Sequence, residues 1–310
     1  MHKTYIKRQL HGWVVVDKPL GFTSTDIVRI IKKKFNVKKV GHGGTLDPMA
    51  TGILPIAIGE ATKTVSYLMD SKKTYTFTVK WGEETDTDDS TGNIINQKIL
   101  YPDLVDVKKI IPRFIGEIDQ LPPIYSAKKI NGKRAYKIAR DGEIPNLSTN
   151  KVKIENIKIL EKISEKEMSF EVTCGKGTYV RSLARDFGRC LGTYGHITKL
   201  KRTAYGPFFN KIIISIDRLN EINHVIDNLY LLIQPIETVL DDILAVKINN
   251  QEANKLKTGL SIPLSPEYNG NNDRGAYAIF EKKLIAICKI NENVLKPIRV
   301  LNIEDKKTGE

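Results

Sequence analysis

The sequence has few cysteines and no long apolar run. Its three cysteines form no CxxC pair, which argues against a disulfide framework or a zinc ribbon and is typical of a reducing compartment. No apolar segment approaches the roughly 20 residues of a transmembrane helix. The first residues include basic side chains but lack the apolar core of a secretory signal. We therefore expect a soluble, cytoplasmic protein without membrane contact.

Sequence signals for metals and cofactors are also missing. The five histidines never reach metal-ligand spacing, and no GxGxxG follows a strand-like segment, which argues against a Rossmann-type cofactor site. The segment Asp86–Gly92 resembles the start of an EF-hand. However, Thr91 stands where that loop needs glycine, and Gln97 stands where it needs glutamate. We expect no metal and no cofactor.

The charge is strongly positive and unevenly distributed. Forty-nine Lys and Arg against 36 Asp and Glu give a net charge of +13. Residues 121–210 hold 18 basic and 8 acidic side chains, whereas residues 241–310 hold 11 and 10. This concentration predicts a positive face whose natural partners are phosphate polyanions such as nucleic acids. Composition alone is equally compatible with a solvated, Lys-rich surface.

Periodicity predicts a mixture of strands and helices. Gly12–Asp17 indicates a buried strand, and Thr74–Trp81 alternates strictly, with Tyr75 at the start of its apolar face. Thr23 and Asp26 form a capping-box pattern before a helix. The shorter strand Ser169–Thr173 leads through a glycine turn into a helix with Thr178 as its N-cap. Strands and helices do not alternate regularly, so we expect an α+β fold on a mixed sheet.

The composition changes near Val239. Short β-like runs follow, interrupted by an Asn- and Gly-rich loop over 268–274. We therefore expect two parts, a larger domain over 1–238 and a small all-β module over 239–310. A module of this size is near the lower limit for independent folding.

Three glycines precede a single aspartate in Val40–Ala57 (VGHGGTLDPMATGILPIA). Glycine permits close backbone approaches, and Pro48 biases Asp47 towards extended geometry, which fixes the direction of its carboxylate. Such a loop suits a nucleophile or base. The alternative is a glycine-rich turn in which Asp47 bonds its own backbone.

This segment resembles the catalytic-aspartate motif of the pseudouridine synthases, in the branch of the bacterial TruB enzymes that modify uridine 55 of tRNA. Three further regions resemble TruB motifs in the same order. They are 71–89 (SKKTYTFTVKWGEETDTDD), 121–143 (LPPIYSAKKINGKRAYKIARDGE), and 174–188 (CGKGTYVRSLARDFG) with 196–208 (HITKLKRTAYGPF). Four motifs in order make the resemblance specific.

The resemblance implies a fold, a reaction and a substrate. The larger domain becomes a pseudouridine synthase catalytic domain, and the small β module becomes a PUA-like RNA-binding module. The reaction is the isomerisation of uridine to pseudouridine in the T-loop of tRNA, with Asp47 as nucleophile and an extruded target base. Whether Asp47 first attacks the sugar or the base stays open. The implied partner is the T-arm stem-loop of tRNA, and a monomer without an obligatory protein partner is expected.

The resemblance also implies roles for residues around Asp47. Arg181 pairs with the carboxylate, Tyr75 stacks on the target base, and Tyr179 adds another pocket aromatic. Leu200 packs near the target, and His42 inserts where the base leaves the RNA stack. The residues themselves leave other interpretations open. Arg181 also suits a surface cation on a basic helix stripe, Tyr75 suits core packing, and His42 suits a turn.

Candidate RNA-binding residues lie in the TruB-specific region: Lys128, Lys129, Lys133 and Arg134, with Tyr125 and Tyr136 interleaved. Cations mixed with aromatics suit a cradle of phosphate contacts and stacking. The alternative is a solvated helix with a Lys face. Farther along, Arg185 and Arg189 are expected to face solvent or phosphate.

Two other functions compete with a stand-alone enzyme. One is a non-catalytic tRNA-binding folding helper, against which the presence of Asp47, Tyr75 and Arg181 argues. The other is a guide-RNA-dependent synthase that needs partner proteins. The TruB-like region 121–143 and the lack of a long Lys-rich tail favour the stand-alone enzyme.

Overall fold

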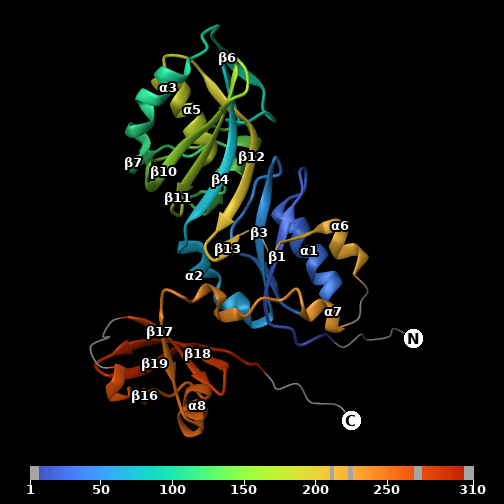
Figure 1. The fold of residues 1–310 in the computed structure, drawn as a ribbon, viewed down its shortest axis with the longest axis vertical. Coiled ribbons are helices and arrows are strands. Elements are labelled where there is room, and N and C mark those ends of the chain that lie inside the picture. The colour runs from blue at the N-terminus through green and yellow to red at the C-terminus, as the bar shows by residue number, and fades with distance from the viewer. Residues whose placement is uncertain (1–6, 210–212, 223–225, 269–273, 304–310) are drawn as a thin grey trace.

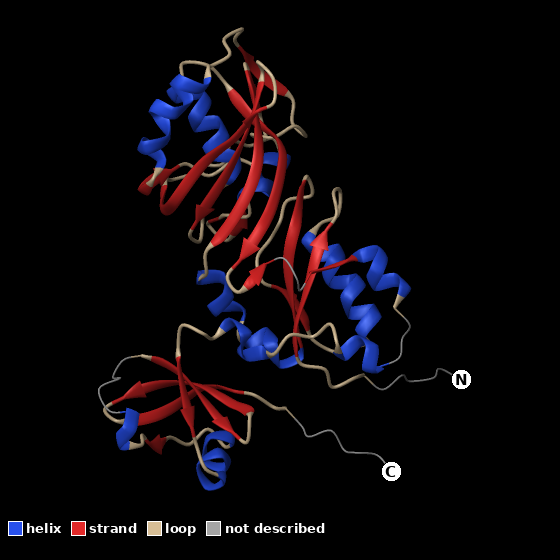
Figure 2. Ribbon diagram, in the orientation of Figure 1, coloured by secondary structure: helices blue, strands red, loops and turns tan. Residues whose placement is uncertain are grey.

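A large mixed sheet forms the centre of the computed structural model, which describes residues 7–209, 213–222, 226–268 and 274–303 (Figures 1 and 2). The main path of this ten-stranded sheet runs β14-β1-β3-β12-β4-β11-β10-β7, with β2 paired to β3 and β13 to β12. The pairs β1–β14 and β3–β12 are parallel and the others antiparallel. The predicted α+β fold on a mixed sheet is therefore confirmed.

The strands of this sheet vary widely in length. They are β1 Gly12–Lys18, β2 Val40–His42, β3 Ala50–Ile58, β4 Lys73–Trp81, β7 Gly116–Gln120, β10 Asn150–Lys162, β11 Glu167–Cys174, β12 Gly195–Tyr205, β13 Phe208–Phe209 and β14 Ile213–Ser215. Two small hairpins lie beside it, β5 Glu83–Thr85 with β6 Ile94–Gln97 and β8 Lys129–Ile130 with β9 Lys133–Arg134.

Helices cover the sheet in two groups (Figure 1). Near β7, β10 and β11 lie α3 Leu104–Ile110 and α5 Val180–Cys190; near β1 lie α1 Ser24–Phe35, α6 Ile216–Glu221 and α7 Ile226–Tyr230. The shorter helices α2 Val65–Asp70 and α4 Ala135–Arg140 complete this part. Among the described residues, no helix combines the length and apolar character needed to cross a membrane.

The alternating strand appears as β4. Phe77, Val79 and Trp81 are buried on the face that the pattern predicts. Phe77 stacks on Phe170 of β11 with ring centroids 5.3 Å apart, and Phe187 of α5 packs on both rings. This aromatic cluster anchors α5 to the sheet and so fixes the helix that carries Arg181.

Helix starts were predicted with mixed success. The capping box of Thr23 and Asp26 is present at α1, as expected. The N-cap of α5 is Tyr179, so the prediction of Thr178 was wrong. The side chain of Gln120 explains the difference. Its amide accepts from Tyr179 N at 2.8 Å and donates to Tyr179 O at 3.1 Å, and so holds Tyr179 in the extended geometry of an N-cap.

The carboxy-terminal part forms a separate five-stranded sheet in the order β15-β17-β18-β19-β16. The predicted β module is therefore confirmed, but it is not all-β, because it also contains a helix. That helix is largely polar, burying only Ala253 and Leu256, and it begins with a capping box of Asn249 and Glu252. The elements are β15 Leu244–Lys247, α8 Asn250–Lys257, β16 Ile262–Pro263, β17 Gly275–Phe280, β18 Lys283–Asn291 and β19 Val294–Val300. Most of the predicted loop 268–274 lies outside the described residues, and the division at residue 239 stays a prediction.

This module packs directly against the large sheet. One apolar cluster includes Trp13, Leu68 and Phe208 from the large part together with Leu284 and Ile287 from β18. A polar latch lies beside it. The Lys63 ammonium donates to the carboxylate of Glu60 and, at 2.7 Å, to Val300 O. The Asn302 N–H donates to the same carboxylate at 2.8 Å. The two parts therefore share a core.

Candidate active site

Asp47 lies on a tightly bonded loop between β2 and β3. Gly43 N donates to Pro55 O at 2.8 Å, and Ala50 N donates to Asp47 O at 3.0 Å. The Ser24 hydroxyl accepts from Leu46 N at 2.9 Å and donates to Leu46 O at 3.1 Å. The loop is thus held on both sides of Asp47, while 37% of the Asp47 side chain stays exposed. A fixed backbone that presents an accessible carboxylate suits a nucleophile.

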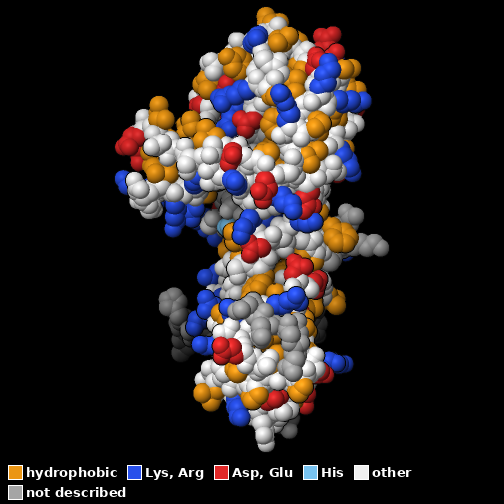
Figure 3. All heavy atoms as spheres, turned by 90° about the vertical axis from the view of Figure 1, so that its left-hand side faces the viewer, with side chains coloured by type: hydrophobic (Ala, Val, Ile, Leu, Met, Phe, Trp, Pro, Cys, Tyr) orange, Lys and Arg blue, Asp and Glu red, His pale blue; other side chains and the backbone are white. Residues whose placement is uncertain are grey.

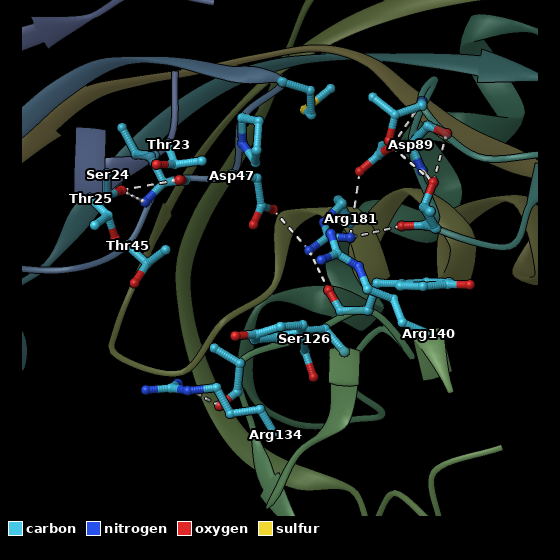
Figure 4. Close-up of a pocket in the computed structure, with 18 of the residues that line it drawn as sticks. Thr23, Ser24, Thr25, Thr45, Asp47, Asp89, Ser126, Arg134, Arg140 and Arg181 are labelled. Atoms are coloured by element: carbon cyan, nitrogen blue, oxygen red, sulfur yellow. Dashed lines mark hydrogen bonds and ion pairs between the residues drawn. The ribbon is translucent and has the colours of Figure 1, made fainter. Parts of the chain in front are cut away.

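Arg181 lies directly against this carboxylate (Figure 4). Its Nη2 is 2.9 Å from Asp47 Oδ2, and only 6% of its side chain is exposed. The same guanidinium donates to Thr87 O at 2.9 Å and to Tyr125 O at 3.1 Å. The surface-cation interpretation of Arg181 was therefore wrong. Charge-assisted contact with a fixed guanidinium sets the direction of the Asp47 carboxylate.

Asp89 supports Arg181 from the other side, at 3.4 Å from Nη1. Its Oδ1 accepts from Thr87 Oγ1 at 2.8 Å, Thr91 N at 2.9 Å and Thr91 Oγ1 at 2.5 Å. Sequence reasoning included Asp89 in the TruB-like region 71–89 but assigned it no role, and it tested the chemistry of 86–92 only as a calcium loop. The available signal was the pattern of carboxylates and threonines two residues apart, which is typical of turns in which an Asp bonds its own backbone.

The same acidic turn buries a second arginine. Arg185 contacts Asp88 Oδ2 and Asp186 Oδ1, each at 2.9 Å, and donates to Leu121 O at 2.8 Å. Burial raises the pKa of Asp88 to about 6. The expectation that Arg185 faces solvent or phosphate was wrong, because the turn crosses the helix face that carries it. Arg189 is half exposed and bonds Glu84.

A cavity of about 290 Å³ brings together the residues expected around the target base. Asp47, Tyr75, Tyr179, Arg181 and Leu200 all line it. Burial raises the pKa of the Tyr75 and Tyr179 hydroxyls, so both phenols stay protonated and neutral near pH 7. The cavity volume is close to the lower end of the range for small-molecule sites, about 300 Å³.

A larger cavity of about 650 Å³ lies on the other side of Asp47 and shares Asp47 and Arg181 with the first. Its lining includes His42, Arg134, Arg140, Tyr125 and Tyr136. Figure 4 labels the two arginines. His42 Nδ1 accepts from Gly44 N at 3.3 Å, and burial lowers the His42 pKa, so this ring is neutral near pH 7.

The four candidate RNA-binding cations are arranged differently from one another. Arg134 lines the larger cavity, but Lys128, Lys129 and Lys133 line neither cavity. The Lys128 ammonium donates to Ser148 O at 2.7 Å and Asn150 Oδ1 at 2.8 Å, so it ties a loop. Lys129 and Lys133 are exposed on the β8–β9 hairpin. The alternative interpretation, a solvated helix with a Lys face, is therefore wrong for residues 128–134, which contain the strands of this hairpin.

Buried cations also surround the site. Lys18, Lys73 and Arg202 are each at least nine-tenths buried, and burial lowers the pKa of Lys18 and of Lys73 to about 8. Across the described part of the chain, none of the three lies within ion-pair distance of a carboxylate. On the surface, Lys and Arg side chains gather below a lobe that projects from the upper part (Figure 3). The site and its surroundings favour an anionic partner.

Two family models match consecutive parts of this sequence. Residues 32–180 match the model of the TruB family pseudouridylate synthase, N terminal domain. Residues 181–241 match the model of the tRNA pseudouridylate synthase B C-terminal domain. These two matches place the chain in the class of the pseudouridylate synthases.

Similarity to known proteins extends over nearly the whole chain. A protein of Bradyrhizobium diazoefficiens named tRNA pseudouridine synthase B is 44% identical over 305 residues, covering 96% of this chain and 87% of that protein. An equally named protein of Ehrlichia ruminantium is 44% identical over 298 residues, covering 95% and 100%. The chain belongs to the TruB family.

Solved structures show the same fold. The archaeal box H/ACA sRNP Nop10-Cbf5 complex contains a chain that matches with a TM-score of 0.71 and 23% identity, covering 95% of this chain and 87% of that one. A Cbf5-Nop10-Gar1 complex matches with a TM-score of 0.68 and 26% identity, covering 95% and 84%.

Proposed function

We propose that this chain converts uridine 55 in the T-loop of tRNA to pseudouridine, with Asp47 as the nucleophile. One observation carries the proposal: an accessible Asp47 carboxylate lies 2.9 Å from a buried Arg181 at the boundary of two cavities. Relatives named tRNA pseudouridine synthase B support tRNA as the substrate. The T-loop position comes from the motif resemblance. The enzyme acts as a cytoplasmic monomer without an obligatory protein partner.

The reaction is an isomerisation at one nucleotide. The N1–C1′ bond breaks, the uracil turns, a C5–C1′ bond forms, and the proton on C5 leaves as N1 regains one. Asp47 forms the transient covalent bond and is released at the end, so no atoms are gained or lost. A carboxylate is suited to such a step, as retaining glycosidases show. The proposal is independent of whether Asp47 first attacks the sugar or the base.

The two cavities divide the substrate between them. The smaller one takes the uracil, where Tyr75 offers a neutral aromatic face and Leu200 an apolar contact. The larger one takes the RNA strand on either side, near His42 and Arg134. Extruding a base costs a few kcal/mol. Stacking on an aromatic side chain returns about 1–3 kcal/mol per base, so Tyr75 and its neighbours offset most of this cost.

The decisive test is turnover by the purified wild-type protein and its Asp47→Asn variant on unmodified tRNA. The amide has the shape of the carboxylate but is far less nucleophilic. We expect wild type to form pseudouridine at position 55 without added partners. The variant should bind tRNA within about threefold of wild type and lose at least about 1,000-fold in single-turnover rate. Asp119→Asn, which changes the same charge on the exposed surface of β7, is the control.

The rival functions give different results. Tight binding of tRNA by wild type without product would indicate the folding helper. Product only after addition of guide RNA and partner proteins would indicate the guide-dependent enzyme. An Asp47→Asn variant that keeps more than about 1% of the wild-type rate would rule out Asp47 as the nucleophile.

A further inference from the structure

Arg202 of β12 lies beneath the loop that carries Asp47 and bonds it twice. Its Nε donates to Ile53 O at 2.7 Å, and its Nη2 donates to Gly44 O at 3.2 Å. Gly44 lies in the loop before Asp47 and Ile53 lies in β3 after it, so one guanidinium joins the loop to the strand that follows it. Only 1% of Arg202 is exposed.

The backbone around Arg202 leaves no freedom for another arrangement. Strand β12 runs parallel to β3 with Arg202 opposite Gly52, whose φ of +98° favours glycine. A Cβ at Gly52 would lie 2.3 Å from Arg202 O. The backbones of the two strands are therefore so close here that only glycine fits. The position of the Arg202 backbone relative to the start of β3 is therefore fixed.

An aromatic ring completes the support. The Arg202 guanidinium lies 4.7 Å from the ring centroid of Tyr205, which is itself buried. A Cβ at Gly44 would lie 3.0 Å from the Tyr205 hydroxyl oxygen, so this hydroxyl occupies the space beside Gly44. Arg202 and Tyr205 together form the floor on which the Asp47 loop rests.

Burying the positive charge of Arg202 at this position costs folding free energy. In the described parts of the chain, the guanidinium has no carboxylate within ion-pair distance, although buried cations are normally paired. Lys18 and Lys73, two more buried cations, raise that cost through repulsion. A neutral side chain would fill the same space at lower cost. What it would lack is the pair of divergent N–H donors that reach both carbonyls.

We propose that Arg202 is a positioning residue, whose guanidinium clasps the Asp47 loop to strand β3 and so holds the Asp47 carboxylate in register with Arg181 and the target nucleotide. This role rests on the proposed function of Asp47. Misplacing a reacting group by about 1 Å costs roughly 100-fold in rate. Loss of the clasp therefore affects the chemical step more than RNA binding.

Two substitutions separate the clasp from the charge. Arg202→Lys keeps the positive charge but reaches only one of the two carbonyls. Arg202→Gln loses the charge and likewise reaches one. Lys34→Gln is the matched control, because the buried Lys34 ammonium also bridges two backbone carbonyls, Asn220 O at 3.1 Å and Ile222 O at 2.7 Å, at the far end of α1.

Four quantities are measured for each variant: the single-turnover rate at saturating T-arm RNA, the Kd for that RNA, the melting temperature, and hydrogen–deuterium exchange in peptides covering 43–53. We expect both Arg202 variants to exchange faster within 43–53 and to lose about 100-fold in rate, with Kd within about threefold of wild type. Lys34→Gln should lower the melting temperature comparably while leaving the rate and the exchange of 43–53 unchanged.

Three outcomes overturn the proposal. Arg202→Lys with wild-type rate and wild-type exchange means that charge alone is required. Faster exchange spread evenly over the chain means that Arg202 supports the fold in general. Faster exchange in 43–53 with an unchanged rate means that the loop needs no clasp. If wild type forms no pseudouridine, the proposed function fails, and the exchange measurement still decides whether Arg202 holds the loop.

Discussion

The β8–β9 hairpin gives a sharp prediction about how RNA is bound. Lys129 lies directly opposite Arg134, so their side chains share one face of the hairpin, whereas Lys133 lies opposite Ile130 on the other face. Like charges directly opposite each other destabilise a hairpin. Arg134 lines the larger cavity. We therefore expect a phosphate of the RNA to lie between Lys129 and Arg134, and none at Lys133.

The salt dependence of binding measures this contact. Each phosphate contact contributes about 0.7–0.9 to the slope of log K against log salt. Lys129→Gln should therefore lower the slope by about 0.7–0.9, and Lys133→Gln should leave it unchanged. Over a fourfold change in salt, one contact of this kind changes affinity by about threefold. Lys128 is unsuitable for the comparison, because its substitution would also release the loop at Ser148.

The assay is the Kd for T-arm RNA at several salt concentrations, with every variant made in the Asp47→Asn background to stop turnover. Lys133→Gln changes the net charge by the same amount as Lys129→Gln and so serves as the internal control. Equal slope changes in the two variants would show that general surface charge, rather than the paired face of the hairpin, binds the RNA.

Three further predictions concern the buried charges. Asp89→Asn removes one of the two carboxylates at Arg181, and the single-turnover rate should fall about 10- to 100-fold with little change in RNA Kd. Burial lowers the pKa of Lys73 from 10.5 to about 8, so the unfolded chain binds more protons between these values and stability rises with pH across that window. Lys73→Met should remove about 2 kcal/mol of this rise when urea unfolding is compared at pH 8 and pH 10. Glu60→Gln leaves the partly buried Lys63 ammonium without its carboxylate and should lower the free energy of unfolding by about 1.5–3 kcal/mol in the same assay.

Local patterns predicted the parts of the fold that depend on neighbouring residues. The alternation of β4 and the capping box at Thr23 involve side chains within a few positions of one another, and both appear as expected. The prediction of the N-cap of α5 was wrong, because that N-cap depends on Gln120, which is far away in the sequence. The helix α8 was not predicted, because it buries only Ala253 and Leu256 and its apolar periodicity is therefore too weak to indicate a helix.

The site shows the same division. The glycine-rich segment marked Asp47 as a special position, and motif resemblance connected it to Arg181. The environment of Arg185 was not predictable from its helix, because Asp88 lies almost one hundred residues earlier in the chain. Residue type alone also did not distinguish the bonded Lys128 from the exposed Lys129. Contacts between distant segments decide which cations are bonded within the protein and which remain available to a ligand.

The apolar cluster and the Glu60 latch between the large sheet and the carboxy-terminal module have a consequence for substrate choice. The module acquires its orientation when the chain folds, so an RNA that reaches it does not bear the orientational entropy that a flexibly tethered module loses on binding. Its distance from Asp47 is constant as well. An RNA arm would contact both parts at the same time only if its length matched their separation.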